Sequence, residues 1–226
     1  TTRLVGSEMC IRDSYDLDHT LAGDYLRQFT YPWEALAGIG DMISALGAAL
    51  PADEYDHPEE GVWVARDAKV YPTAYLGAPC IIGHKTEVRP GAFIRGNALI
   101  GAGCVVGNST ELKNVILFDN VQVPHYNYVG DSILGYKSHM GAGSITSNVK
   151  SDKLPVVIHN EGEEIETGRK KVGAMLGDYV EVGCNSVLNP GTVIGRDASV
   201  YPTSCVRGVV PERCIYKAKG NIAVKK

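Results

Sequence analysis

The chain has 226 residues, a formal net charge of −4 and 44% apolar residues. It contains no apolar run of about 18 residues that could span a membrane and no basic tract that would bind nucleic acid, so we expect a soluble protein with neither partner. Its six cysteines form no C-x-x-C pair. This favours reduced thiols in the cytoplasm over a disulfide framework or a zinc site.

The N-terminal segment, residues 1–14, differs from the rest of the chain. Its stretch Leu4–Ser14 resembles translated sequencing-adaptor sequence, and no initiator Met precedes it. We therefore expect residues 1–14 to be a non-native tail that is poorly ordered unless a contact holds it.

Residues 15–60 carry a helical pattern. Apolar residues recur three or four positions apart, as one face of an α-helix requires, at Trp33, Leu36, Ile39, Ile43, Leu46 and Leu50. Thr30 can cap this helix, Pro32 is tolerated in its first turn, and Pro51 ends it. The segment is too short for a good core of its own, so we expect it to pack on the rest of the chain.

From residue 61 onwards the chain has a period of six. An aliphatic or Phe residue recurs at every sixth position, at Val64, Val70, Leu76, Ile82, Val88, Ile94, Ile100, Val106, Leu112 and Phe118. Two further blocks follow, at Tyr128, Leu134, Met140 and Thr146, and then at Leu176, Val182, Leu188, Ile194, Val200 and Val206. Six is a multiple of the two-residue period of a strand, so the pattern predicts short strands that turn a corner every six residues, as in a parallel β-helix.

Two stretches interrupt this period. The repeat would place its next apolar residue at position 124, which is Pro, and the frame returns at Tyr128. We interpret residues 124–127 as a four-residue insertion that carries His125 out of the wall. The second interruption, residues 149–173, contains two short runs around a turn at 160–163 and predicts a hairpin excursion. It ends in the basic run Arg169, Lys170 and Lys171.

These elements predict an all-β fold. We expect residues 61–226 to form one β-helix domain, with the excursion at 149–173 and a tail at 212–226. Because the open end of a solenoid exposes unpaired backbone, we expect residues 15–60 to be a short N-terminal helical cap over that end. The six-residue repeat resembles that of the left-handed β-helix acyltransferases, and the resemblance implies a left-handed coil and a homotrimer.

A more specific motif lies within the repeats. It consists of His125-Tyr126-Asn127-Tyr128-Val129-Gly130-Asp131 followed by Gly141-Ala142-Gly143 and Asn148. Over roughly residues 61–216 the chain resembles the acetyltransferase half of the bifunctional bacterial enzymes that make UDP-N-acetylglucosamine. It is more similar still to archaeal sugar-1-phosphate nucleotidylyltransferase/acetyltransferases. The resemblance implies acetyl-CoA-dependent N-acetylation of an amino-sugar phosphate such as glucosamine 1-phosphate.

The resemblance also implies a role for each matching residue near the reaction centre. His125 matches the general base that removes a proton from the sugar amine. Asn148 matches an asparagine beside the amine and the acetyl group, and Tyr128 matches a sugar-binding tyrosine. Ala142 matches a residue whose backbone N–H faces the acetyl oxygen. Independently of the resemblance, amide formation needs a base and donors for the oxyanion, which His125 and a Gly-flanked N–H can supply.

Further residues match the binding sites for the two substrates. Arg89 and Lys113 match a basic pair that holds the sugar phosphate, and His139 stands where the bacterial family has a substrate-binding asparagine. Along the coenzyme A groove, Cys184 and Tyr201-Pro202 stand where the bacterial family has small residues. The basic run 169–171 is either solvated or a clamp for coenzyme A. Lys217 or Lys219 takes the place of an arginine that meets the coenzyme A phosphates. The resemblance implies no metal site.

Other functions remain open on the sequence alone. One is O-acylation of another sugar, and another is a non-catalytic scaffold or regulatory subunit. A zinc-dependent γ-carbonic anhydrase needs two His five residues apart, whereas His84, His125 and His139 are separated by 41 and 14 positions. Residues 15–60 contain no Gly-rich, Arg-containing nucleotide loop, so we expect no nucleotidyltransferase activity from this chain.

Overall fold

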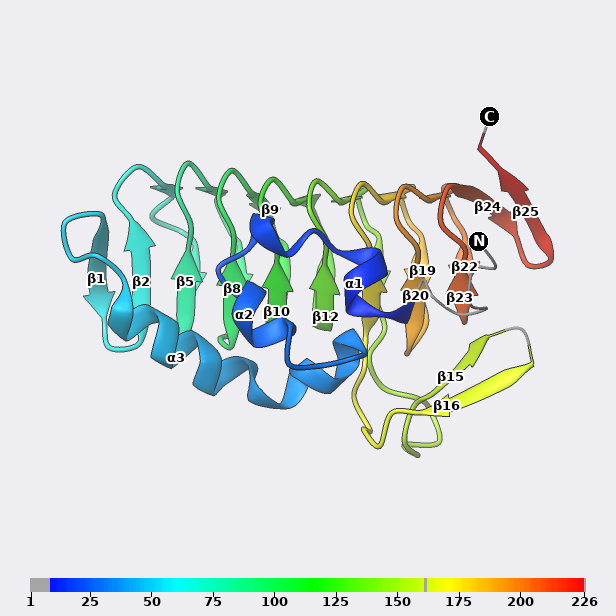
Figure 1. The fold of residues 1–226 in the computed structure, drawn as a ribbon. Helices are drawn as coiled ribbons and strands as arrows, with labels where there is room; N and C mark the ends of the chain where they lie inside the picture. The colour runs from blue at the N-terminus through cyan, green and yellow to red at the C-terminus, as the bar shows by residue number, and fades with distance from the viewer. Residues whose placement is uncertain (1–8, 161, 226) are drawn as a thin grey trace.

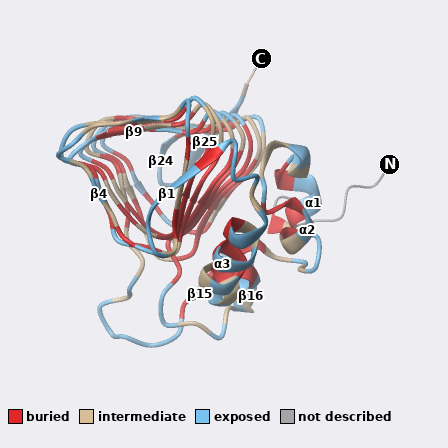
Figure 2. Cartoon of the chain, turned by 90° about the vertical axis from the view of Figure 1, so that its left-hand side faces the viewer, coloured by how far each residue is buried: buried red, intermediate tan, exposed pale blue. Residues whose placement is uncertain are grey.

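A computed structural model describes residues 9–160 and 162–225. It is a left-handed parallel β-helix, as the six-residue period predicts, and its successive coils lie side by side along one axis (Figure 1). Seen along that axis, the coils have a triangular cross-section with helices against one side (Figure 2). No helix in the described ranges is both long and apolar enough to cross a membrane.

The strands form three faces. The first face consists of β2 (Val62–Ala65), β5 (Cys80–Ile82), β8 (Ala98–Ile100), the ends of β10 (Glu111–Leu117) and β12 (Tyr128–Leu134), β17 (Ala174–Leu176), β20 (Thr192–Ile194) and β23 (Val209–Val210). The second face consists of β3 (Lys69–Val70), β6 (Glu87–Val88), β9 (Val105–Asn108), β11 (Gln122–His125), β13 (His139–Met140), β18 (Glu181–Val182), β21 (Ser199–Val200) and β24 (Cys214–Ala218). The third face consists of β4 (Tyr75–Leu76), β7 (Phe93–Ile94), the starts of β10 and β12, β14 (Ile145–Thr146), β19 (Val187–Leu188) and β22 (Cys205–Val206).

The register of the coils corrects one sequence interpretation. Val123 pairs with Val106, and Val129 pairs with Leu112, so the corner between them has its ordinary length. Residues 124–127 are therefore not an insertion. The frame shifts because two other steps between inward residues are five residues long and not six. The first runs from Leu112 to Leu117, since Leu117 and not Phe118 pairs with Ile100. The second runs from Val129 to Leu134, which pairs with Leu117.

The N-terminal helical segment is present, but it lies along a side of the solenoid and not over its end. The 3₁₀ helix η3 (Pro32–Gly38) contacts β12, and α3 (Ile39–Ala49) contacts β5, β8 and β10 on the first face (Figure 1). The edge of the first coil is instead covered by β1 (Tyr55–Glu59), which pairs antiparallel with β2. The helical stretch begins after Tyr31, and Glu34 accepts hydrogen bonds from the N–H groups of Thr30 and Tyr31, so Thr30 is not the cap.

This placement follows from the side chains on the first face. In each of its central strands the middle residue points outward, and these residues are all apolar and 0–2% exposed: Ile81, Leu99, Ile116, Ile133, Met175 and Val193. A sheet that is apolar on both sides must be covered on both sides. The helices α1 (Ile11–Ser14), η2 (Leu17–His19), α2 (Gly23–Leu26), η3 and α3 lie on that side of the molecule (Figures 1 and 2).

Part of the stretch that was expected to be a foreign tail packs on the fold. Met9 and Ile11 are 2% and 1% exposed, and the backbone N–H of Asp178 donates to the carbonyl of Ser14 at 3.0 Å. Residues 1–8 lie outside the described residues. A contact therefore holds residues 9–14, and the adaptor origin of residues 1–14 stays a prediction.

The excursion forms the predicted hairpin, from β15 (Val157–Asn160) and β16 (Glu163–Glu166) paired antiparallel. It leaves the solenoid at the corner between the third and first faces, and Val156 and Ile158 are fully buried. The tail also differs from expectation. Cys214–Ala218 continues the second face by pairing with β21, and only β25 (Asn221–Val224), antiparallel to β24, lies beyond the coils.

Candidate functional site

His125, Ala142 and Cys184 stack on successive coils at the corner between the second and third faces. The carbonyl of His125 accepts from the N–H of Gly143 at 3.0 Å, and the carbonyl of Ala142 accepts from the N–H of Asn185 at 2.8 Å. These ladder bonds fix three predicted site residues in a single row. We call this row the histidine edge.

The histidine edge has free groups suited to chemistry. The imidazole of His125 is exposed and has no hydrogen-bond partner within the described residues, and the N–H of Ala142 has no acceptor there. Cys184 is exposed as well. Lys217 follows on the last coil, 6.0 Å from the ring centre of Tyr201, which gives the edge a cationic end.

Asn127 fixes the corner that carries His125, a role that the sequence reasoning missed. Its side chain is 2% exposed. Its Oδ1 accepts from the N–H of His125 at 3.1 Å, and its Nδ2 donates to the carbonyls of Gly141 and Ser144 at 2.9 and 3.0 Å. The amide thus ties the His125 corner to the Ala142 corner. The signal was its place inside the histidine motif.

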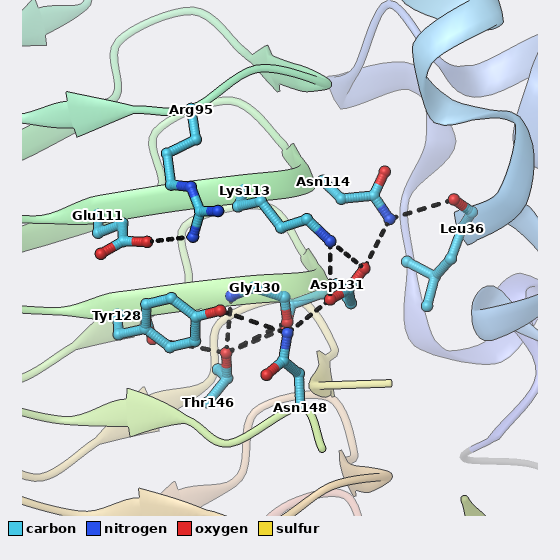
Figure 3. Close-up of polar contacts among 11 residues, drawn as sticks. Leu36, Arg95, Glu111, Lys113, Asn114, Tyr128, Gly130, Asp131, Thr146 and Asn148 are labelled. Carbon is cyan, nitrogen blue, oxygen red and sulfur yellow. Dashed lines mark hydrogen bonds and ion pairs between the residues drawn. The ribbon is translucent and has the colours of Figure 1, made fainter. Parts of the chain in front are cut away.

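Tyr128, Asn148 and Lys113 converge at the other edge of the third face, where it meets the first face (Figure 3). All three are linked through Asp131, which is 2% exposed. Its carboxylate accepts from Lys113 Nζ at 3.2 and 3.3 Å and from Asn148 Nδ2 at 2.5 Å, and Asn148 Nδ2 lies 3.3 Å from the Tyr128 hydroxyl. We call these four residues the aspartate cluster.

Asp131 was quoted in the motif but given no role, and the structure makes it the centre of this cluster. It also accepts from Asn114 Nδ2 at 2.9 Å, and that amide donates to the carbonyl of Leu36 in η3 (Figure 3). The cluster therefore connects three successive coils and the helical segment. A buried carboxylate is expected to be satisfied in this way, since an unpaired one is costly.

Gly130 allows Tyr128 to reach Asn148. The ring of Tyr128 lies across residue 130, where a Cβ would come within 2.5 Å of the phenol oxygen. Burial, followed by the nearby charges of Asp131 and Glu111, raises the pKa of the Tyr128 hydroxyl. The phenol is therefore a neutral group at physiological pH, available as a hydrogen-bond donor.

Three predicted residues do not join a common site within this chain. Arg89 lies at the corner of the histidine edge, 3.3 Å from Glu87, while Lys113 lies across the third face in the aspartate cluster. The predicted basic pair is thus separated. His139 is on the second face and contacts Glu181 at 2.8 Å. Lys219 lines a separate hollow with Arg207 at the C-terminal end of the solenoid.

We searched the described residues for a metal site. Within the described ranges, no group of three His, Cys, Asp or Glu residues is arranged to hold an ion. The two ring nitrogens of His84 contact Asp67 at 2.9 Å and Glu54 at 3.3 Å, so both are occupied by carboxylate partners.

Comparison with known proteins places the chain in a family. The family model described as the GMPPB C-terminal domain matches residues 76–218. A bifunctional sugar-1-phosphate nucleotidylyltransferase/acetyltransferase from Sulfurisphaera tokodaii is 32% identical over 145 residues, which cover 64% of this chain and 36% of that protein. A protein named bifunctional protein GlmU from Methanococcus maripaludis strain C5 is 32% identical over 139 residues, 61% of this chain and 33% of that one.

These relatives are longer than the present chain, which spans about a third of their length. Among solved structures, a hexapeptide transferase family protein from Anaplasma phagocytophilum is similar with a TM-score of 0.41 at 13% identity, covering 73% of this chain and 79% of that one.

Proposed function

This chain belongs to the family of the GMPPB C-terminal domain, and we propose that it is an acetyl-CoA-dependent N-acetyltransferase whose acceptor is an amino-sugar phosphate such as glucosamine 1-phosphate. The observation that carries the proposal is the histidine edge. Among the described residues, it presents an imidazole without a partner one coil away from a backbone N–H without an acceptor. A base and an oxyanion donor are the two groups that amide formation from a thioester requires.

In the proposed reaction His125 accepts a proton from the acceptor amine. The nitrogen then attacks the thioester carbonyl, and the N–H of Ala142 donates to the oxygen on which negative charge develops. The C–S bond of the adduct breaks, and the leaving coenzyme A thiolate takes the proton from His125 as the amide forms. Asn148 is held by Asp131 and Tyr128, so its side chain is positioned before the acceptor binds. Its Nδ2 already donates to both of these groups, so its Oδ1 remains to accept a hydrogen bond from the acceptor amine.

We assign the coenzyme to the histidine edge. The half-buried Ala142 and the exposed Cys184 lie on two successive coils, and Lys217 offers a cation at the end of the row for a phosphate. A thioester at Ala142 with its nucleotide end toward Lys217 would lie parallel to the solenoid axis. The coenzyme supplies an activated acetyl group there.

We further propose that the chain works as a homotrimer in which the third face of one copy meets another copy. His125 and Asn148 lie at opposite edges of this face, so a site that uses both is naturally completed between two copies. The outer surface of the face also carries Tyr75 and Phe93, which are 59% and 43% exposed with ring centres 5.5 Å apart. Exposed neighbouring aromatics are typical of protein interfaces.

The direct test is thiol release from acetyl-CoA in the presence of a panel of acceptors. The panel contains amino-sugar 1-phosphates, the same sugars without phosphate, and sugars with a hydroxyl in place of the amine. We expect release with the amino-sugar phosphates. Release only with the hydroxyl sugars would reassign the chain to O-acylation, and no release with any member would contradict an acetyltransferase role.

A further inference from the structure

The excursion returns to the solenoid beside the aspartate cluster. The N–H of Val172 donates to the carbonyl of Asn148 at 3.0 Å, and the N–H of Gly173 donates to the carbonyl of Asp131 at 2.8 Å. Lys171 forms an isolated β-bridge with Val149. The basic run Arg169–Lys171 is therefore fixed in place next to Asn148, and its position does not depend on a flexible loop.

The three basic side chains lack protein partners. Within the described part of the chain, none of Arg169, Lys170 and Lys171 makes a side-chain hydrogen bond or an ion pair. Arg169 is half-buried, and its Nε atom is buried without an acceptor. Buried donors are nearly always satisfied, by protein, water or ligand. An unsatisfied guanidinium nitrogen next to two free ammonium groups points to an anion.

The run lines a hollow of about 500 Å³ that it shares with Lys113, Asp131 and Leu36. Inside this hollow the charge of Lys113 is balanced by Asp131, so the positive charges of the run are the unbalanced ones. Arg169 can offer two parallel N–H donors, the geometry that a phosphate oxygen pair accepts best. The adjoining lysines add charge without a fixed geometry.

We propose that this hollow binds the phosphate of the acceptor, with Arg169 as the principal contact and Lys113 and Lys171 beside it. The inference rests on the proposed function and refines it, because the sequence resemblance pairs Lys113 with Arg89. In this chain Arg89 is across the third face and contacts Glu87. The acceptor's phosphate fits better than that of the coenzyme, since the hollow adjoins Asn148 and Tyr128 and not the Ala142–Cys184 row.

The test compares Arg169→Gln with Arg169→Lys, using Arg207→Gln in the separate hollow as the matched control. Hydrogen bonds to charged groups are strong enough that losing them should raise the KM for an amino-sugar phosphate about 10–100-fold. The KM for the same amino sugar without phosphate should stay within about twofold, kcat should change little, and Arg169→Lys should recover part of the loss. Arg207→Gln should behave as the wild type.

Two results would overturn the inference while leaving the acetyltransferase function intact. One is that Arg89→Gln, and not Arg169→Gln, raises the KM of the phosphorylated acceptor selectively. The other is that Arg169→Gln raises the KM of acetyl-CoA but not that of acetyl-dephospho-CoA, which would place the coenzyme's phosphate in the hollow.

If the wild-type chain transfers no acetyl group, calorimetric titration with inorganic phosphate separates the two proposals. Phosphate binding that Arg169→Gln abolishes and Arg207→Gln retains supports the hollow as an anion site even then. Absence of phosphate binding by the wild type would refute it.

Discussion

Asn114 and Asp131 occupy the same corner of neighbouring coils, and the amide of one donates to the carboxylate of the other at 2.9 Å. Both have a positive φ, of 55° and 48°. Asn and Asp are the non-glycine residues that adopt this conformation most readily. At this corner β10 and β12 use one residue fewer than the preceding coil does between Ile94 and Ile100, and the two side chains are in contact.

Asp131→Ala should therefore be strongly destabilising. It removes a buried carboxylate that satisfies Lys113, Asn114 and Asn148, and it puts Ala in a left-handed conformation. Breaking a buried ion pair from one side costs about 3–5 kcal/mol. Asp131→Asn tolerates the conformation and keeps an acceptor oxygen, so it should cost less. Urea unfolding of both variants measures the difference, and equal stability of Asp131→Ala and the wild type would contradict the role of the cluster.

The same corner explains why the register could not be predicted from the sequence. The six-residue period specifies the fold because ten consecutive positions share one frame, and that prediction is confirmed. A coil that is one residue shorter shifts the position of every later apolar residue in the six-residue frame. The shift alone does not show at which corner the residue is missing. Leu117 and Phe118 are both apolar, and Phe118 instead packs 5.3 Å from the ring of Tyr15 in the N-terminal segment. The local sequence pattern therefore cannot show which of these two adjacent residues points into the solenoid.

The face on which the helical segment packs, by contrast, could have been predicted from the sequence. On the first face the outward residues between two inward ones are apolar, as in Cys80-Ile81-Ile82 and Ala98-Leu99-Ile100, whereas the second face has Glu87, Gln122 and Glu181 at outward positions. The first face thus required a cover, whereas the second did not. The sequence reasoning assigned the helix to the end of the solenoid because it considered the unpaired edge and not this asymmetry.

Gly47→Ala tests how closely α3 packs on that face. Alanine is a better helix former than glycine by about 1 kcal/mol, so propensity alone predicts a gain in stability. However, a Cβ at position 47 would lie 2.4 Å from the ring of Trp63. We expect a net loss of about 1–3 kcal/mol in the free energy of unfolding from overpacking. Ser44→Ala on the exposed side of α3 is the control and should be neutral or slightly stabilising.

The candidate site was predicted in part. The sequence motif named His125, Ala142, Tyr128 and Asn148, and the structure assembles them as two groups at opposite edges of one face. The six-residue spacing alone could not show this division, because adjacent corners are equivalent in a regular repeat. The separation of Arg89 from Lys113 has the same cause. Each follows an inward-pointing residue of the repeat, but Arg89 follows a strand of the second face and Lys113 follows the third-face part of β10.

The exposed aromatic pair gives a test of the trimer. Phe93→Glu should place a charge in the proposed interface, so sedimentation should change from the mass of three chains to that of one, and acetyl transfer should fall with it. Leu21→Glu, at a residue that is 44% exposed in the helical segment, is the matched control and should leave the mass unchanged. A wild-type chain that sediments as a monomer at micromolar concentration would refute the trimer itself.

Asp178 should make the stability depend on pH in the direction opposite to an ordinary ion-paired carboxylate. Burial raises the pKa of Asp178 above 3.8, despite hydrogen bonds from the N–H groups of Asp16 and Tyr136 and the charge of Arg196. The folded chain therefore binds this proton more tightly than the unfolded chain does. The resulting stabilisation is fully present below 3.8 and is lost as the pH rises through the raised pKa.

The unfolding free energy of the wild type relative to Asp178→Asn should accordingly decrease from acidic toward neutral pH. Urea unfolding of both chains at a series of pH values measures this difference, in which the other titrating groups cancel. A difference that grows with pH would mean that the pKa of Asp178 is lowered in the folded chain and not raised.

His125 is the residue on which the proposed chemistry depends most. Its imidazole has no partner in the described chain, and Asn127 fixes its backbone without touching the ring, so replacing the ring should not disturb the fold. General-base catalysis contributes about 10²–10⁴-fold, and His125→Ala should lower kcat by such a factor. The KM for acetyl-CoA should stay within a few-fold, because the coenzyme is assigned to the Ala142–Cys184 row. His159→Asn, on the excursion hairpin, is the control and should keep full activity. If His125→Ala retained most of the wild-type kcat, the base would have to be sought elsewhere, and His139 on the second face would be the next residue to replace.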